Sequence, residues 1–160
     1  IVCLVSDTLD DMGLSGVLPA SLMRPVVAGR AIAGPALTIR KVRRRGALKE
    51  EGYSPRGDIE AHNLTNPGDV LVIESHPDIS NMGGISALTG KRQGSVGAII
   101  WGGCRDVAEM REMDYPVWST SITPVTGVGR VESGIINGDV QIGSFLVRCG
   151  DIIVADDDGV

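Results

Sequence analysis

The sequence predicts a single α/β domain whose second part is rich in β-strands. In the centre of the chain, short continuous apolar runs alternate with helical segments, which is the pattern of βαβ units with parallel strands. The part after Thr120 is rich in glycine and contains only short strand-like runs. A length of 160 residues is that of about one domain, so we expect residues 1–160 to form one.

Four helices are predicted from start and stop signals. Ser6 or Asp7 is a suitable N-cap for the first helix, and Gly13 is a suitable stop. The turn sequence Asn66-Pro67-Gly68 ends the second helix. The predicted helices cover residues 6–13, 58–64, 83–92 and 106–113, and the polar stretch 49–57 is predicted to be a loop.

Strands are predicted from their apolar runs. Residues 69–74, 96–101 and 115–119 are almost continuously apolar, as expected of strands that are buried on both faces. Residues 30–42 alternate small and apolar residues around Pro35, which indicates two strands or one bent strand. Shorter strands are predicted at 127–131, 140–142, 145–147 and 152–155.

The composition excludes several other classes of protein. The chain is 42% apolar with a formal net charge of −5, so it is too apolar and too weakly charged to be disordered. Its 22 glycines show no three-residue period, which excludes collagen. No apolar run approaches the length of a membrane span. We therefore expect a cytoplasmic protein with neither nucleic acid nor membrane among its partners.

The three cysteines, Cys3, Cys104 and Cys149, are widely spaced and form no CxxC pair. This spacing argues against a zinc or thioredoxin-type site and favours a reducing compartment. Cys104 has no histidine beside it in the sequence, and we interpret it as a small buried residue rather than a nucleophile. His62 and His76 are not at the spacing of a zinc-ligand pair.

A basic run places five cations in the six positions from Arg40 to Arg45. We interpret it as a solvated strand end, since charge runs usually mark exposed faces. The alternative is a rim that attracts anions or contacts an acidic partner. The aromatic residues that an RNA-stacking platform needs are missing from this run.

Two strand ends are candidates for chemistry, because ligands of open α/β sheets bind beyond the carboxyl ends of the strands. One leads through Gly83-Gly84 into a helix, whose free N–H groups can bind an anion. The other leads into Arg105-Asp106, where Arg105 can clamp a carboxylate and Asp106 offers a hard oxygen to Mg²⁺. Together they predict a site for a small α-keto acid, at which a metal would stabilise an enolate. The alternative is that Arg105-Asp106 is an ordinary helix start.

These motifs resemble the RraA-like family, which includes the class II 4-hydroxy-4-methyl-2-oxoglutarate/4-carboxy-4-hydroxy-2-oxoadipate aldolases. The resemblance is specific because its segments follow one order along nearly the whole chain. The matching segments are 6–13, 34–38, 67–72, 83–84, 97–106, 115–117 and 150–159.

The resemblance implies an α/β/α layered fold of the swivelling type, in homotrimers or homohexamers with sites between subunits. By the same resemblance, Arg105 binds the carboxylate and oxygen of a 2-oxo acid, and Asp106 holds Mg²⁺ or Mn²⁺. The backbone amides after the glycine loop correspond to Ile85 and Ser86, and the acidic run 156–158 corresponds to a turn. Both ends of the chain look cut, so we expect the acidic residue that a neighbouring subunit contributes to lie beyond it.

The sequence departs from the family pattern at two positions. The aldolases carry an acidic residue where this chain has Gly84, and that residue orders metal-bound water. The family often has Asp where this chain has Trp101, whose ring would reshape the pocket if it points inward. Glu74 or Asp78 is a hypothetical replacement for the lost carboxylate, because both lie on the loop that leads to Gly84.

Three functions follow from the resemblance. The first is a metal-dependent lyase that cleaves a 4-hydroxy-2-oxo acid or decarboxylates oxaloacetate. The second is a non-catalytic regulator that binds an RNA-degrading endonuclease, and Asp106 argues for the enzyme because such regulators lack this residue. The third, demethylmenaquinone methyltransferase, is a label long attached to the family. It is disfavoured because no strand leads into a glycine-rich loop for the methyl donor.

Overall fold

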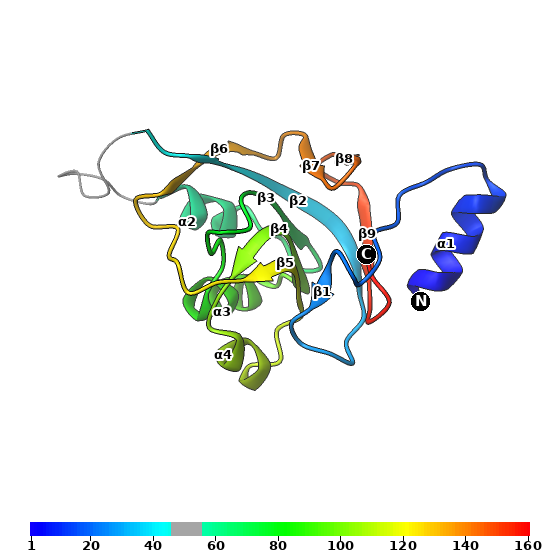
Figure 1. Ribbon diagram of the computed structural model, residues 1–160, viewed down its shortest axis with the longest axis horizontal. Helices are drawn as coiled ribbons and strands as arrows, with labels where there is room; N and C mark the ends of the chain where they lie inside the picture. The colour runs from blue at the N-terminus through cyan, green and yellow to red at the C-terminus, as the bar shows by residue number, and fades with distance from the viewer. Residues whose placement is uncertain (46–55) are drawn as a thin grey trace.

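The computed structural model describes residues 1–45 and 56–160, and it shows an α/β domain with a central mixed sheet (Figure 1). The helices are α1 (Val2–Asp11), α2 (Arg56–Asn63), α3 (Gly84–Gln93) and α4 (Val107–Glu112). The strands are β1 (Arg24–Pro25), β2 (Ile32–Arg43), β3 (Val70–Glu74), β4 (Gly97–Cys104), β5 (Val117–Ile122), β6 (Val131–Ile136), β7 (Val140–Ile142), β8 (Phe145–Val147) and β9 (Ile152–Ala155).

The strand order of the main sheet is β1-β5-β4-β3-β2-β6, with β9 paired to β2. The pairs β2–β3, β3–β4 and β4–β5 are parallel, while β1, β6 and β9 pair antiparallel. The parallel βαβ units predicted for the centre of the chain are therefore confirmed, and so is the β-rich C-terminal part, where β7 and β8 form a separate antiparallel pair.

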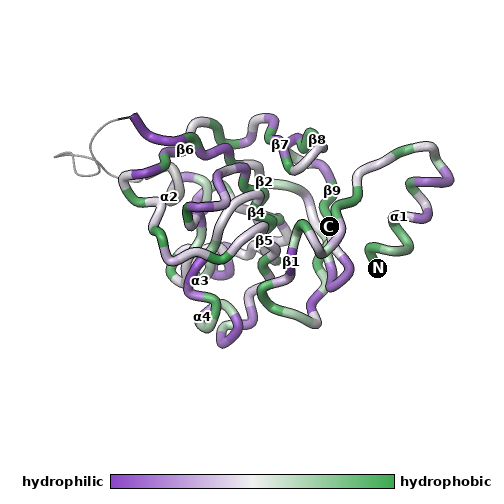
Figure 2. The backbone as a smooth tube through the Cα atoms, in the orientation of Figure 1, coloured by the Kyte–Doolittle hydropathy of each residue, from purple (hydrophilic) through white to green (hydrophobic). Residues whose placement is uncertain are grey.

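The central strands are buried on both faces, as their continuous apolar runs predict. In β3, Leu71 and Ile73 face a core cluster that includes Ala87 of α3 and Met110 of α4. The alternate residues of β3 face a second cluster that includes Trp118 of β5 and Ile142 of β7. In Figure 2 the hydrophobic colour gathers in the middle of the sheet, and the end of β2 that carries the basic run is hydrophilic. Among the described residues, no helix is long and apolar enough to cross a membrane.

The sequence around Pro35 allowed two predictions, two strands or one bent strand. The structure shows one continuous strand there, β2, over Ile32–Arg43. Its first half pairs with β9, and its second half lies between β3 and β6. A register shift against β6 lies between Arg40 and Lys41. The single strand spans the sheet in Figure 1 and carries the basic run to its carboxyl edge.

The predicted start of the first helix was wrong. Helix α1 begins at Val2, so Ser6 and Asp7 lie inside it and cap nothing. Gly13 is confirmed as the stop, because it follows the C-cap residue Met12 with φ of +68°.

Two further predictions lie in the connections. The predicted strand at 127–131 was wrong: Gly127 starts a turn in which its carbonyl accepts from the N–H groups of Arg130 and Val131, and Gly129 has φ of +74°. The strand β6 begins only at Val131. The predicted loop at 49–57 lies mostly outside the described residues, and its last two residues belong to α2.

Candidate active site

The carboxyl ends of β3 and β4 carry the loops that the sequence analysis singled out. The loop after β3 crosses the end of β4, where Ser80 forms bridges to Gly103 and to Thr126. Asn81 is buried, and its N–H donates to the Gly103 carbonyl over 2.8 Å. The two loops are therefore fixed against each other at one edge of the sheet.

The pair Gly102-Gly103 is explained by this crossing. A Cβ atom at Gly102 would lie 2.7 Å from the Asn81 side-chain nitrogen, and one at Gly103 would lie 2.7 Å from the Ile79 carbonyl oxygen. Any larger residue would push the β3 loop away from the sheet. These glycines serve close packing between two backbones.

The second glycine pair, Gly83-Gly84, packs against Arg105 and Asp106. A Cβ atom at Gly83 would lie 2.5 Å from Oδ2 of Asp106 and 3.2 Å from Nε of Arg105. The Arg105 N–H donates to the Met82 carbonyl, which ties the two strand ends together. The structure thus brings together the predicted residues Gly83, Arg105 and Asp106.

Asp106 is held in an uncommon backbone conformation. It precedes α4 with φ of +58° and ψ of +41°, the left-handed region that residues other than glycine rarely adopt. Its carboxylate does not cap α4; instead Oδ2 accepts a hydrogen bond of 3.0 Å from the N–H of Gly84, at the start of α3. An ordinary helix start needs neither feature, but Asp106 does lie at the N-cap position of α4, so both interpretations of this residue stay predictions.

Arg105 and Asp106 remain accessible to a ligand. Their side chains are 41% and 38% exposed, and Nε of Arg105 lies 3.7 Å from Oδ2 of Asp106. An exposed pair at this distance is weak, so the guanidinium keeps donors for an incoming carboxylate. The site therefore presents one positive and one negative group side by side at the edge of the sheet.

The start of α3 provides backbone donors. Gly83 is its N-cap, and the N–H groups of Ile85 and Ser86 lie in the first turn, where no helical partner exists for them. The Ser86 hydroxyl lies 2.9 Å from Nε2 of the buried His62 on α2. Ile85 is 84% exposed, so the approach to this first turn is open.

Glu109 is a residue of this site that the sequence analysis missed. A Cβ atom at Gly84 would lie 1.7 Å from Oε2 of Glu109, so the Glu109 carboxylate fills the space that a side chain at position 84 would take. Glu109 lies three residues after Asp106, in the first turn of α4. That three-residue spacing was the available signal.

The two carboxylates proposed as replacements for the missing acid lie elsewhere. Glu74 accepts a hydrogen bond from Nε of Arg40 over 2.8 Å and another from the Gln141 N–H. Asp78 accepts two hydrogen bonds from Arg43, which lower the pKa of the Asp78 carboxyl below its ordinary value.

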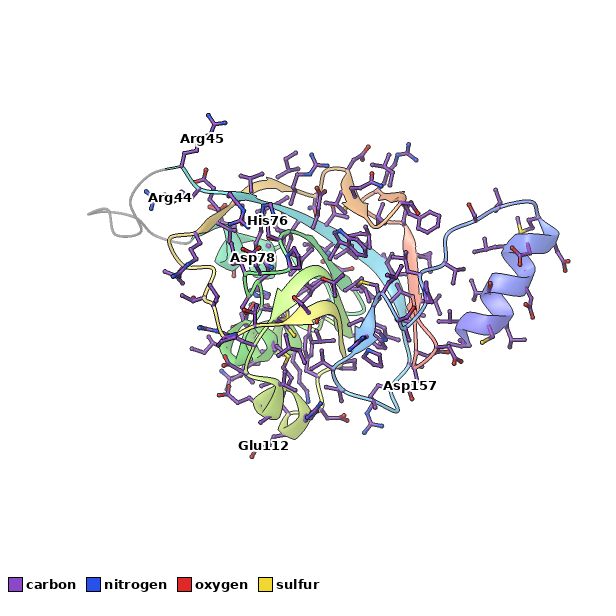
Figure 3. The ribbon with its side chains drawn as sticks, in the orientation of Figure 1. Arg44, Arg45, His76, Asp78, Glu112 and Asp157 are labelled. Carbon is purple, nitrogen blue, oxygen red and sulfur yellow. The ribbon has the colours of Figure 1, made fainter. Side chains whose placement is uncertain are left out.

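The basic run lies at the end of β2, as predicted, and Arg43 and Arg45 are exposed, but other members of the run are held by the protein. Arg40 and Arg43 form ion pairs, and Lys41 is only 6% exposed, with its ammonium donating to the Asn81 carbonyl. Much of the run therefore binds the loop after β3. Arg44 and Arg45 lie at the far end of the run, at the outer edge of the molecule in Figure 3.

Trp101 does not narrow the site. Its ring belongs to the core cluster on the face of the sheet opposite α3 and α4, where it approaches Gly143 of the β7–β8 turn. The departure from the family pattern at Trp101 therefore lies in the second core cluster.

His76 is half-buried on the loop after β3, near Asp78 (Figure 3).

Two other predictions are confirmed. Cys104 is fully buried, as predicted, and its sulfur lies 3.3 Å from the Ser119 hydroxyl. Burial raises the pKa of its thiol, which argues against a role as nucleophile. The acidic run 156–158 forms a turn, in which the N–H of Asp158 donates to the Asp156 carboxylate. The carboxylate of Asp157, at the right of Figure 3, accepts a hydrogen bond from the N–H of Gly29.

The Asp106 carboxylate is the kind of hard oxygen donor that Mg²⁺ or Mn²⁺ prefers. Mg²⁺ is commonly bound by one or two carboxylates, with substrate and water completing the shell. The Oδ2 atom of Asp106 accepts a hydrogen bond from the Gly84 N–H and lies against Gly83. The described residues contain no group of three His, Cys, Asp or Glu side chains suited to a metal, so an ion here would rely on substrate oxygens.

The fold is thus a mixed α/β domain that brings an arginine, an aspartate and a glycine pair together at the carboxyl edge of its parallel strands. The chain belongs to the RraA-like family, described as Aldolase/RraA, whose pattern matches residues 2–160.

The similar proteins include both enzymes by name and regulators by name. DlpA of Legionella pneumophila is 31% identical over 98% of this chain. A protein of Halalkalibacterium halodurans, provisionally named 4-hydroxy-4-methyl-2-oxoglutarate aldolase, is 27% identical over 98% of this chain and 69% of its own length. The crystal structure of RraAS2 from Streptomyces coelicolor, described as an unusual member of the RNase ES inhibitor RraA family, superposes with a TM-score of 0.78. It is 26% identical and covers 97% of this chain and 76% of that one.

The match to DlpA covers only a quarter of that protein, 25% of its length. The similarity therefore shows the family and the domain. It leaves the reaction, the substrate and the partners of this chain to be argued from its own site.

Proposed function

We propose that this chain is a divalent-metal-dependent lyase acting on a pyruvate-like 2-oxo acid. The reaction is aldol cleavage of a 4-hydroxy-2-oxo acid, decarboxylation of oxaloacetate, or both. In each, the bond between C3 and C4 breaks, one carbon away from the keto carbon C2. The electron pair stays with C3 and forms the enolate of pyruvate, while C4 leaves as a carbonyl compound, after loss of the proton of the 4-hydroxyl group, or as CO2. The protein must then bind a carboxylate and stabilise a developing negative charge.

The observation that supports the proposal is the placement of Asp106. Its left-handed backbone and its hydrogen bond to the Gly84 N–H place a carboxylate at the start of α3, beside the Arg105 guanidinium. Strained backbone conformations persist where the surrounding structure fixes them, and they are concentrated at functional sites. A glycine at position 83 leaves room for both side chains.

The chemistry divides among these groups. Arg105 binds the substrate carboxylate through its planar donors, and the first-turn N–H groups of Ile85 and Ser86 add a partial positive charge. Asp106 is the residue that would hold Mg²⁺ or Mn²⁺, and a bound cation supplies the charge that stabilises an enolate. Gly83 and Gly84 let the substrate approach the backbone closely.

The test is pyruvate release from oxaloacetate and from 4-hydroxy-4-methyl-2-oxoglutarate, with Mg²⁺ and then with EDTA. We expect release that requires the metal and that falls about 100-fold or more in Arg105→Ala, through loss of the carboxylate clamp. Arg92→Ala is the matched control, because Arg92 is an exposed arginine in the last turn of α3. Equal rates with Mg²⁺ and with EDTA would refute the proposal.

The alternative function, a regulator that binds an endonuclease, is an outcome of the same test. A folded chain that releases no pyruvate from either substrate would favour it. The name of the Streptomyces coelicolor relative makes this outcome worth testing.

A further inference from the structure

A small polar cavity lies between the sheet and the start of α3, on the face that α2 and α3 cover. Four different parts of the fold supply its polar lining, which consists of Lys41 of β2, His62 of α2, Asn81 of the loop after β3, and Ser86 of α3. Apolar side chains of β2 and β3 complete the walls. The cavity has room for about one water molecule, so it is too small for a substrate.

Asn81 brings an acceptor to this cavity. Its side-chain nitrogen donates to the carbonyl of Ile79 over 2.8 Å and to that of Gly103 over 3.3 Å. These two acceptors fix which end of the amide is the nitrogen, so Oδ1 is the other end. Asn81 is only 4% exposed, and no residue that the structure describes donates to its buried Oδ1. The atom therefore needs a ligand that donates a hydrogen bond, which suits water and excludes a halide ion.

A histidine holds the side chain of Ser86 from the interior. Nε2 of His62 lies 2.9 Å from the Ser86 hydroxyl, which is hydrogen-bond distance. His62 is only 5% exposed, so bulk water competes little for this contact. The pair joins α2 to the first turn of α3, the turn whose free N–H groups are proposed to bind the substrate carboxylate.

These contacts lie on both sides of the start of α3 along the chain. Asn81 is two residues before Gly83, and Ser86 is three residues after it. The Asn81 carbonyl also accepts a hydrogen bond of 3.0 Å from the buried ammonium of Lys41. The start of α3 is thus fixed from the interior by this cluster, while the Asp106 carboxylate holds it from the side of the site.

We propose that the His62–Ser86 pair, with a water molecule that donates to Oδ1 of Asn81, positions the first turn of α3 to bind a carboxylate. Ser86 and His62 are positioning residues in this role, because their side chains act through the N–H groups of the turn. Backbone donors that are held in place before binding lose less freedom when the substrate arrives. The inference rests on the proposed function, since it concerns the site that this function uses.

The first test measures the Kd of pyruvate by calorimetry of the full chain with Mg²⁺. Ser86→Ala removes the hydroxyl, and His62→Leu removes the ring nitrogens. We expect each change to raise Kd about five- to tenfold, the effect of one lost hydrogen bond. Because both changes break the same contact, the double variant should bind about as weakly as either single variant.

The matched control is Thr89→Val, which removes another hydroxyl of α3. The Thr89 hydroxyl donates to the Ile85 carbonyl within the helix and does not line the cavity. This variant should bind pyruvate like the unmodified chain. A purely structural role of Ser86 would lower the melting temperature and leave Kd unchanged, so unchanged Kd in Ser86→Ala would overturn the positioning role.

The second test is a crystal structure of the unmodified chain at a resolution that shows ordered water. We expect one water molecule in the cavity, about 2.5–3.0 Å from Oδ1 of Asn81. A cavity without ordered water, or a protein group bonded to Oδ1, would overturn the assignment of the water.

Failure of this inference can be told apart from failure of the proposed function. If the unmodified chain binds no pyruvate with Mg²⁺, the proposed function fails and the inference falls with it. If the unmodified chain binds pyruvate and Ser86→Ala binds it equally well, the site stands and only the positioning role fails.

Discussion

Replacing Gly83 by alanine should disable the site and leave the fold in place. The added methyl would lie 2.5 Å from Oδ2 of Asp106, and ordinary van der Waals contact begins at 3.4 Å. The Asp106 carboxylate must therefore move by about 0.9 Å, or the start of α3 must move with it. A misplacement of about 1 Å in a catalytic group costs on the order of 100-fold in rate, so we expect kcat/KM to fall by about that factor.

The backbone at Gly83 does not oppose the change. Its φ of −124° and ψ of −173° are extended values that any residue adopts. The loss of stability should thus be limited to about 1 kcal/mol, as for an alanine at an N-cap. The control is Gly16→Ala, where the nearest atom to the added methyl is 4.0 Å away.

The assay is pyruvate release from oxaloacetate with Mg²⁺, coupled to the oxidation of NADH, together with a thermal melt of each variant. A Gly83→Ala chain that keeps kcat/KM close to that of Gly16→Ala would refute the argument that the glycine makes room for Asp106. A large drop in the melting temperature would refute the argument that its backbone is unstrained.

Further predictions concern stability and titration at Gly34, Tyr115 and Asp78. Gly34→Ala should destabilise the chain by about 3 kcal/mol or more, because the new methyl would lie 2.1 Å from a backbone carbonyl oxygen; urea denaturation that shows no loss would contradict this. Tyr115→Phe removes a buried hydrogen bond of 2.9 Å to Ser95 and should cost about 1–2 kcal/mol in the same assay. Burial raises the pKa of Tyr115, so its phenol should stay protonated as pH rises, and early ionisation at 295 nm would count against its burial. Hydrogen bonds from Arg43 lower the pKa of Asp78, so this pair stabilises the fold above the ordinary carboxyl pKa and loses its effect as pH falls through the lowered pKa. An NMR titration of the parent chain, with Asp78→Asn to assign the signal, measures the pKa of Asp78. An ordinary value would contradict the pairing.

The sequence predicts the central sheet well because its strands are buried on both faces, so their apolar runs are continuous. Val70 and Leu71 are fully buried on opposite faces of β3, so no polar residue interrupts the run. Predictions failed where local signals alone were available. Val128 and Arg130 resemble residues of a strand, but Gly127 and Gly129 direct the backbone into a turn.

Only part of the candidate site could be predicted, because the order of elements along the chain places some residues and tertiary packing places the others. Arg105 and Asp106 follow a strand and precede a helix, so their place at the sheet edge follows from the order of elements. Glu109 could not be placed over Gly84 in this way, because that contact depends on how α3 and α4 pack against the same face. The burial of Lys41 likewise depends on the path of the loop after β3.

The most direct test of the central claim compares pyruvate release from oxaloacetate by the unmodified chain and by Asp106→Asn at saturating Mg²⁺. The amide keeps the size of the carboxylate and one acceptor oxygen for the Gly84 N–H, so the fold should survive. We expect the rate to fall to that of the reaction without protein while the melting temperature changes little. A rate that persists in Asp106→Asn would contradict the assignment of this aspartate to the chemistry.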